Sequence, residues 1–289
     1  MSLARILALP CWHGTPQAEP LHGGLSNEIW KVTDDDGPHV VRFGLDYPFH
    51  HVNRVREAMT TRAAHAAGFA PAVTYTEPGV MVTDFITSRT LGAADICADP
   101  VRIAHLLHHF HAGMPVHVTG EAYLFWVFHT IRDYARTLTA AGKPVLPGLL
   151  GQANAWEAAQ IPLPIIFAHN DLLPANFLDD GKRLWLIDFE YAGFSTSMFD
   201  LAGAASNAGM TDAQSYTLLA TYFDATPTQA LIRAFDAMQC ASLLREALWA
   251  KVSDLYLSAP GVNYAAYADE NFAKLRAATA AYTLKHGPT

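Results

Sequence analysis

The sequence is poor in cysteine. Only Cys11, Cys97 and Cys240 occur in 289 residues, and they are odd in number and far apart along the chain. They form no CxxC pair and no spacing typical of a disulfide framework. Because disulfides belong to oxidising compartments, this usage favours the reducing cytoplasm.

Long apolar runs are also missing. No stretch reaches the roughly 20 apolar residues that a membrane-spanning helix requires. The run from Ile6 to Cys11 follows Arg5 as in a signal peptide, but it is too short. Trp12 comes next, and there is no small-residue cleavage site. We therefore predict a cytoplasmic protein that does not bind a membrane.

Charge is scarce and mainly negative. Charged residues make up 16 %, and 27 acidic against 19 basic side chains give a net charge of −8. This balance argues against a broad nucleic-acid-binding surface, which needs clustered Lys and Arg. It leaves room for a local phosphate site, which needs only one or two cations and backbone N–H groups. The hydrophobic content of 51 % excludes general disorder.

The periodicity of apolar residues changes along the chain. Short strand-like segments cover 17–22, 28–33, 39–44, 73–75 and 80–86, with a helical pattern over 52–67 between the third and fourth. After the polar break at 87–89, helical patterns cover 100–112, 121–141, 212–222, 228–258 and 265–284, interrupted by a β-like stretch over 165–187. We predict an α+β fold with a small antiparallel β-rich lobe, residues 1–87, and a larger mainly helical lobe, residues 88–289.

The strongest chemical signal lies between residues 165 and 190. An apolar strand leads into His169-Asn170-Asp171, and Asn176 follows five residues after Asp171. A hairpin turning at residues 179–181 then delivers Asp188. Because a hairpin brings its two ends together, Asn176 and Asp188 should lie side by side. Their oxygens suit a hard cation such as Mg²⁺, and Asp171 remains free to act on a substrate proton.

This spacing matches the kinase catalytic loop H-x-D-x-x-x-x-N followed by a metal-binding D-F pair. The alternative is that Asp and Asn merely cap turns, as they often do. Five matching positions in two linked segments of the right strand–loop context favour the kinase interpretation.

The upstream segments supply candidates for binding nucleotide phosphates. Between the first two strands, Gly23 and Gly24 allow a phosphate to approach the backbone, with Ser26 and Asn27 beside them. A Gly-Gly hairpin is also common without a ligand. Arg42 in the third strand is a permanent cation suited to phosphate, although alone it would read as an exposed strand residue. Glu57, on the following helix, is its candidate ion-pair partner; the alternative is a solvated helix charge.

At this point the sequence resembles the choline/ethanolamine kinase family, within the aminoglycoside phosphotransferase branch of the protein-kinase-like fold. The resemblance covers most of residues 20–280. The segments that carry it are GGLSN (23–27), VVRFG (40–44), Glu57, PGVMVTDF (78–85), HNDLLPANFL (169–178), LIDFEYAG (186–193), FDLAG (199–203) and the stretch 243–272.

The resemblance implies a role for each matching position. Asp171 would be the catalytic base, Asn176 and Asp188 the Mg²⁺ ligands, and Arg42 the ligand of the ATP phosphates. Backbone groups around Asp84, Phe85 and Ile86 would hold adenine between the lobes, and Asp200 would brace the catalytic loop. Glu190 would help to bind a second metal or the substrate.

Two departures from protein kinases favour a small acceptor over a peptide. Asn170 replaces the Arg of H-R-D, so a phosphorylated activation loop has no obvious partner. Only eleven residues separate Asp188 from Asp200, and helical sequence follows, which leaves no room for a long peptide-binding segment.

The helix predicted over 228–258 offers an acceptor site. Glu246 and Trp249 share one of its faces, and Tyr264 and Tyr267 follow in the next segment. An aromatic ring beside a carboxylate suits a quaternary ammonium ion, although ordinary aromatic packing explains each of these residues about equally well. We therefore predict an ATP- and Mg²⁺-dependent kinase of a small cationic alcohol, with choline as first choice. Ethanolamine, an aminoglycoside, thiamine or an amino acid are the alternative acceptors, and an inactive nucleotide-binding regulator is the alternative outside enzymes.

A histidine cluster on the helix predicted over 100–112 has a less specific explanation. His105 and His109 have metal-ligand spacing, with His108 and His111 beside them. No acidic partner stands at the HExxH position, so we expect a solvated or partly buried helix face.

Overall fold

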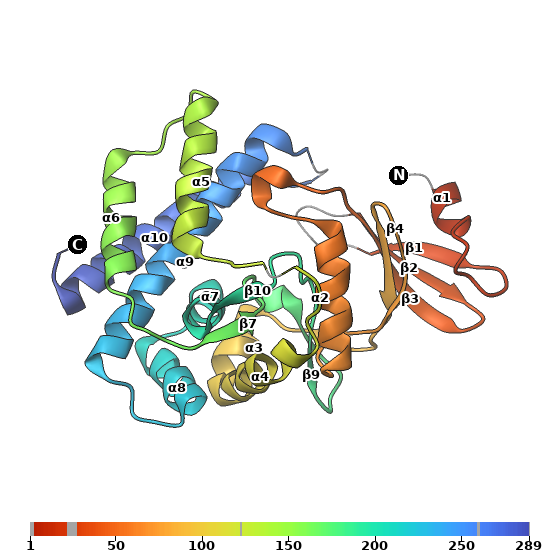
Figure 1. The fold of residues 1–289 in the computed structure, drawn as a ribbon, viewed down its shortest axis with the longest axis horizontal. Helices are drawn as coiled ribbons and strands as arrows, with labels where there is room; N and C mark the ends of the chain where they lie inside the picture. Colours follow the sequence, from red (N-terminus) through yellow and green to blue (C-terminus); the bar gives the residue numbers. More distant parts are fainter. Residues whose placement is uncertain (1–2, 22–27, 122, 259–260, 289) are drawn as a thin grey trace.

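The computed structural model describes residues 3–21, 28–121, 123–258 and 261–288. A small antiparallel sheet stands at one side and a larger, mainly helical part at the other, so the predicted two-lobed α+β fold is confirmed (Figure 1). In the described part of the chain, no helix combines the length and the apolar character that a membrane crossing requires.

The sheet contains five antiparallel strands in the order β1-β2-β3-β5-β4. These are β1 Gln17–Leu21, β2 Glu28–Asp34, β3 Gly37–Phe43, β4 Val73–Glu77 and β5 Val80–Asp84. One face carries Val32, Val41 and Val82, which alternate with more exposed residues as a half-buried sheet requires. A helix that the sequence analysis missed, α1 Leu3–Leu7, buries Ile6 completely against this face.

Helix α2 Arg54–Ala66 lies between the sheet and the helical part (Figure 1). It begins where the Asn53 side chain accepts a hydrogen bond from the Arg56 amide at 2.8 Å. Its Ala63 and Ala64 belong to the core of the helical part. Glu57, one turn in, is 1 % exposed, so this helix carries a buried charge at the junction.

The larger part is built around one long helix. Its helices are α3 Ala93–Ala98, α4 Pro100–Gly113, α5 Val127–Ala140, α6 Pro147–Ala158, α7 Ser197–Ala208, α8 Asp212–Phe223, α9 Gln229–Tyr256 and α10 Tyr264–His286. Helix α9 packs against α5, α6, α7 and α10, which explains why its sequence is apolar nearly all round.

The helix prediction over 121–141 needs correction, and helices α3 and α6 were not predicted. The predicted helix over 121–141 begins only at Val127, because the preceding residues extend along strand β10: Phe194 donates to the Tyr123 carbonyl at 2.7 Å, and Phe125 donates to the Phe194 carbonyl at 2.9 Å. Gly193 permits this close approach, since a Cβ there would lie 2.8 Å from the Tyr123 oxygen. Helix α6 was missed because two glycines and scattered apolar residues obscure its period.

The β-rich insertion forms two small sheets inside the helical part. Strand β7 Ile165–Ala168 pairs with β10 Gly193–Thr196, and β8 Phe177–Asp179 pairs with β9 Leu184–Leu186 as the predicted hairpin. Strand β6 Arg89–Thr90 joins β8 on its other edge. The chain thus enters the helical part directly beside the β8–β9 hairpin, and the boundary near residue 87 stays a prediction.

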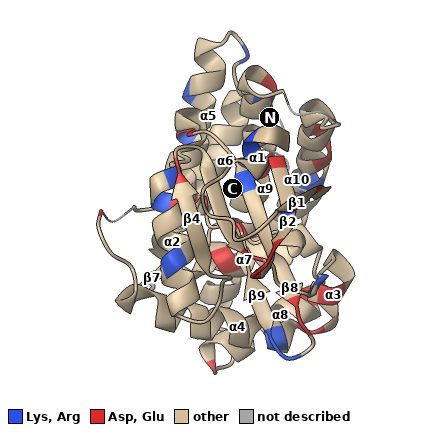
Figure 2. Cartoon of the chain, turned by 90° about the vertical axis from the view of Figure 1, so that its right-hand side faces the viewer, with Lys and Arg blue, Asp and Glu red and all other residues tan. Residues whose placement is uncertain are grey.

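Charges of both signs are spread over the molecule. In the view of Figure 2, Lys and Arg segments alternate with Asp and Glu segments, and most of the ribbon carries neither. This distribution agrees with the low charge content of the sequence.

Candidate active site

The loop after β7 is held by a single buried carboxylate. Asp200, in the first turn of α7, accepts hydrogen bonds from the amides of His169 at 2.8 Å and Asn170 at 2.7 Å. The His111 ring lies 2.9 Å from the same carboxylate. Burial alone would raise the pKa of Asp200, but His111 and the amide of His169 leave this pKa below its ordinary value. The bracing role predicted for Asp200 therefore has a physical basis in the backbone of the loop itself.

Asn170 explains the departure from H-R-D. Its φ of 62° lies in the left-handed region, which Asn tolerates better than most residues. The side chain is fully buried, and its amide donates to the Tyr191 carbonyl at 3.1 Å. Asn170 thus links this loop by a hydrogen bond to the chain just after Asp188. The longer, charged side chain of an arginine would not fit this buried position.

The β8–β9 hairpin brings the two predicted metal ligands, Asn176 and Asp188, side by side at its open end. The Ile187 amide donates to the Asn176 carbonyl at 3.1 Å, so Asp188 follows immediately beside Asn176. The Asn176 side-chain amide donates to the Asp171 carbonyl at 2.8 Å and leaves the side-chain oxygen for another partner. Asp188 has a φ of 69°, a left-handed conformation that turns the chain sharply after β9.

Arg42 connects the sheet to this loop. Its guanidinium forms the predicted ion pair with Glu57 and also donates to Asp188 at 2.8 Å. Arg54, which the sequence analysis did not identify, lies 2.7 Å from Glu57 and 2.9 Å from Glu190. The junction between the two parts is therefore a buried network of alternating charges.

A group of three carboxylates could hold a cation. Single oxygens of Glu57, Asp188 and Glu190 all lie within 4.8 Å of one another. Burial, followed by the nearby Asp188, raises the pKa of Glu190. Such an oxygen-only set fits Mg²⁺ and not a thiolate- or imidazole-seeking metal, and Arg42 and Arg54 pair with the same three carboxylates. Of the two roles expected for Glu190, this position favours metal binding over acceptor binding.

Hydrogen bonds within the protein reduce the number of backbone groups that are available to bind adenine at the predicted site. The Asp84 amide donates to the Ala72 carbonyl and the Phe85 amide to the Pro38 carbonyl, both at 3.0 Å. These two N–H groups are thus already used. Adenine recognition at Asp84 to Ile86 stays a prediction, and it would have to use groups other than these two N–H groups.

The aromatic residues predicted to bind the acceptor lie together, but other protein groups already cover the Trp249 ring. The ring centroids of Tyr264 and Tyr267 lie 5.9 and 6.2 Å from that of Trp249, as the prediction of neighbouring walls requires. However, Trp249 is only 6 % exposed, and the ring of His50 stacks on it at 5.2 Å. Its indole N–H donates to the Tyr191 hydroxyl at 2.9 Å. The packing alternative is therefore as well supported here as the cation cage.

The carboxylate expected to hold the acceptor has partners of its own. Glu246 pairs with Arg245 and accepts from the Tyr267 hydroxyl at 3.2 Å. Arg245, which the sequence analysis did not single out, also lies 3.3 Å from Asp171. Burial raises the pKa of Asp171 well above its ordinary value, although Arg245 acts in the opposite direction. The sequence signal was a cation within the apolar stretch of α9, at a position where a buried charge requires a partner.

The remaining candidates divide into two groups. Gly23, Gly24, Ser26 and Asn27 lie outside the described residues. In the histidine cluster, His105, His108 and His109 are exposed, as expected for a solvated face. His111 differs, because it is 2 % exposed and bridges Asp200 and the Tyr222 hydroxyl.

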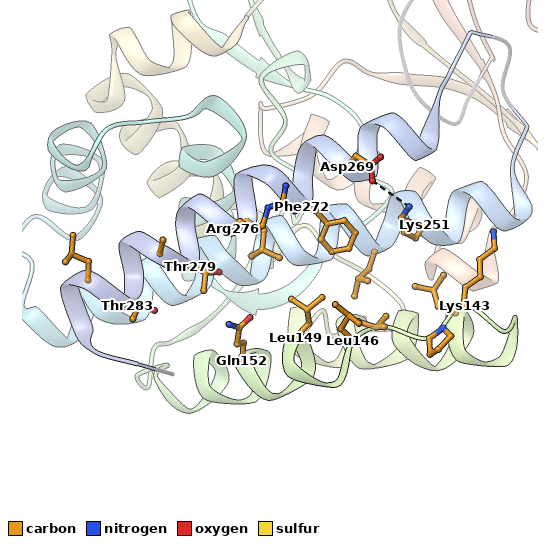
Figure 3. A pocket seen from close by; sticks show the side chains of 17 residues that line it. Lys143, Leu146, Leu149, Gln152, Lys251, Asp269, Phe272, Arg276, Thr279 and Thr283 are labelled. Atoms are coloured by element: carbon orange, nitrogen blue, oxygen red, sulfur yellow. Dashed lines mark ion pairs between the residues drawn. The ribbon is translucent and has the colours of Figure 1, made fainter.

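A separate groove lies away from the candidate active site. A groove of about 1150 Å³ runs between α6 and α10 with α9 at its floor, lined by residues such as Leu146, Leu149 and Phe272 (Figure 3). None of the predicted site residues lines it, so the candidate active site is defined by its charged side chains and not by this groove.

Known proteins resemble this chain in sequence and in fold. The family model for choline/ethanolamine kinase matches residues 18–235. The chain belongs to the choline/ethanolamine kinase family. A probable ethanolamine kinase of Arabidopsis thaliana is 30 % identical over 203 residues, which cover 63 % of this chain and 54 % of the relative. Protein LicA of Haemophilus influenzae is 26 % identical over 214 residues, or 71 % of this chain and 62 % of LicA.

A solved structure resembles almost the whole chain. The choline/ethanolamine kinase family protein of Mesorhizobium loti has a TM-score of 0.78 and 26 % identity, covering 98 % of this chain and 97 % of that one. The chain spans between about half and two thirds of the length of the two curated relatives above. The family resemblance inferred from the motifs is thereby confirmed.

We expect the brace at Asp200 to be a major contributor to stability. Removing one partner of a buried charged network costs about 3–5 kcal/mol, so Asp200→Ala should lower the free energy of unfolding by this amount. Because folding lowers the pKa of Asp200, its contribution is complete above the unfolded-state pKa of about 3.9 and is lost as pH falls through the folded-state pKa.

Urea denaturation between pH 3 and pH 7 measures both effects. Asp269→Ala is the matched control, since that side chain is 78 % exposed and should change stability by less than about 0.5 kcal/mol. Equal acid sensitivity of the wild type and Asp200→Ala would contradict the assignment.

Arg42 and Glu57 should behave as one unit. In a double-mutant cycle with Arg42→Ala and Glu57→Ala, we expect the unfolding free energies to deviate from additivity by about 0.5–3 kcal/mol, because each substitution leaves the other member of this buried pair without its partner. Chemical denaturation of the four proteins provides the measurement. Arg42→Ala combined with Asp269→Ala should be additive, and additivity in the main cycle would mean that the pair is not coupled.

Proposed function

We propose that the protein transfers the γ-phosphoryl group of ATP to the hydroxyl of a small cationic alcohol, of the class to which choline and ethanolamine belong. The observation that carries this proposal is the position of Asp171. It lies on a braced loop beside Asn176, and the same hairpin delivers Asp188. Family membership supports the reaction type, and the charged site supports the class of acceptor.

Asp171 would orient the acceptor hydroxyl and receive its proton. The hydroxyl oxygen forms a bond to the γ-phosphorus while the bond from that phosphorus to the bridging oxygen of ADP breaks. Because burial raises the pKa of Asp171, this carboxylate is a stronger base than an ordinary aspartate. Arg245 at 3.3 Å acts in the opposite direction on this pKa and favours the ionised form.

The nucleotide side of the site would be formed by Arg42, Asn176 and Asp188. Bound Mg²⁺ would neutralise charge on the phosphates, and Asp188 with Asn176 offers the oxygen ligands that hold it. Arg42 already lies 2.8 Å from Asp188, so its guanidinium is positioned beside the metal ligand for contact with a phosphate. Glu57 fixes Arg42 from the α2 side.

The acceptor side carries an excess of negative charge. Asp171 and Glu246 contribute two carboxylates against the single guanidinium of Arg245. A cationic acceptor is favoured by this balance. The ring of His50 covers Trp249, and packing explains this tryptophan as well as a cation cage does, so the proposal concerns the amino alcohol class and not choline alone.

The role of Asp171 can be tested directly. Asp171→Asn should reduce kcat by about 10²–10⁴ and leave the affinity for ATP nearly unchanged, since the amide keeps the shape but cannot accept the proton. ADP release in the presence of ethanolamine or choline gives kcat, and calorimetry gives the affinity. Asp224→Asn, an exposed position at the end of α8, is the control. Near-normal turnover of Asp171→Asn would contradict the proposed mechanism.

Asp188 and Asn176 should differ in their effect on the metal. Asp188→Asn removes a negative charge while retaining a residue that tolerates the left-handed backbone, and it should abolish the Mg²⁺ dependence of nucleotide binding. Asn176→Ala should weaken this dependence only partly, because water can replace a neutral amide oxygen. Titration of ATP with and without Mg²⁺ measures both, and an unchanged metal dependence in Asp188→Asn would refute the assignment.

A further inference from the structure

The groove between α6 and α10 is separate from the proposed active site. Both helices pack on α9, and the groove between them has a volume of about 1150 Å³ (Figure 3). Its lining on α10 extends from Asp269 to Leu284, which corresponds to about 23 Å of helix at 1.5 Å per residue. The groove is therefore long as well as large, and its volume is comparable to that of the larger pockets that hold small molecules.

The walls of the groove are mainly apolar. Leu248 and Leu275 are buried where they line it. Leu146 and Leu284 also line it, and they are 71 % and 89 % exposed although both are large apolar side chains. An exposed apolar surface of this kind beside polar residues is typical of a binding site.

The charged side chains of the groove are mainly positive, although the chain has a net charge of −8. Its lining contains the three cations Lys143, Lys251 and Arg276 and one carboxylate, that of Asp269. The Lys143 ammonium lies 3.7 Å from Asp254 and the Lys251 ammonium 3.9 Å from Asp269, both beyond hydrogen-bonding distance. Arg276 makes no hydrogen bond or ion pair with any residue that the structure describes. The groove thus has positive charge available for an anion.

The positive and apolar residues are distributed along the length of the groove. Figure 3 shows Lys143 and Lys251 at one end, Leu149 and Phe272 in the middle, and Thr283 at the other end. A ligand that fits this order has an anionic group at one end and an extended apolar body.

We propose that the groove binds a fatty acid, with its carboxylate between Lys143 and Lys251 and its alkyl chain extended toward Thr283. A lysine ammonium is a point charge on a flexible stem, so two of them can contact one carboxylate without a fixed bidentate geometry. A single alkyl chain suits a groove between two helices that pack on the same third helix. The proposed cationic acceptor is disfavoured here, because it would meet like charge.

A second copy of the chain is a poorer occupant. A two-fold contact would place the same surface of both copies face to face. The positive groups of one groove would then lie against those of the other, which is unfavourable. A nucleotide or a sugar is also disfavoured, since its many polar groups would face the leucines of the walls.

Laurate and dodecanol form a matched pair for the test, because they have the same alkyl chain and differ in the head group. Calorimetry below the micellar concentration should show one laurate bound about 5- to 20-fold more tightly than dodecanol, since each lysine contributes a partly exposed ion pair. Salt should weaken the binding of laurate and not that of dodecanol. The double variant K143Q/K251Q should remove the difference between the two ligands. K274Q, an exposed position of α10 outside the groove, should retain it.

The place of the alkyl chain is tested by filling the groove. Ala280 lines the groove and is exposed, so A280W should abolish the binding of both ligands. A281W, at an exposed position that does not line the groove, is the matched control. If A280W fails to fold in thermal unfolding, the comparison of K143Q/K251Q with K274Q decides, because all three lysines lie at the surface.

Three results would overturn the inference. The first is equal affinity for laurate and dodecanol in the wild type. The second is laurate binding that neither A280W nor K143Q/K251Q changes, which would mean unspecific adsorption. The third is a dimer in light scattering that A280W converts to monomers, which would assign the groove to a second copy. None of these measurements uses ADP release, so failure here leaves the proposed kinase activity untouched.

Discussion

The hydrogen bonds that two consecutive amides donate to the Asp200 carboxylate hold the loop on which the rest of the site depends. A carboxylate that accepts from the backbone of His169 and Asn170 sets the direction in which the next residue, Asp171, leaves the strand. The same loop binds Asn176 through the Asp171 carbonyl. Helix α9, through Arg245, and the β8–β9 hairpin, through Ile187, both contact this loop.

Around this loop the protein buries more negative than positive charge. Five carboxylates, those of Glu57, Asp171, Asp188, Glu190 and Glu246, are paired with three arginines, Arg42, Arg54 and Arg245. An excess of buried carboxylates is unfavourable until a cation arrives. The folded protein is therefore electrostatically prepared for ligands that bring positive charge, which a magnesium ion and an ammonium group both do.

Local spacing in the sequence was sufficient to predict that Asn176 and Asp188 lie together, because the hairpin joins them within a short segment. It was also sufficient for the Arg42–Glu57 pair, since consecutive elements commonly pack on each other. It was not sufficient for Arg245, whose partner Asp171 is 74 residues away and on another element. The covering of Trp249 by His50 could not be read either, because a short turn after β3 supplies the histidine and nothing in its local pattern indicates its distant neighbour.

The strand that follows Asp188 limits how far this part of the chain can move. Residues 193–196 are paired along β7, and α7 begins directly afterwards, so the segment is part of the sheet that supports the catalytic loop. To move it aside would mean breaking the sheet and the Asp200 brace together. Any displacement of this segment is therefore opposed both by the strand pairing and by the Asp200 hydrogen bonds.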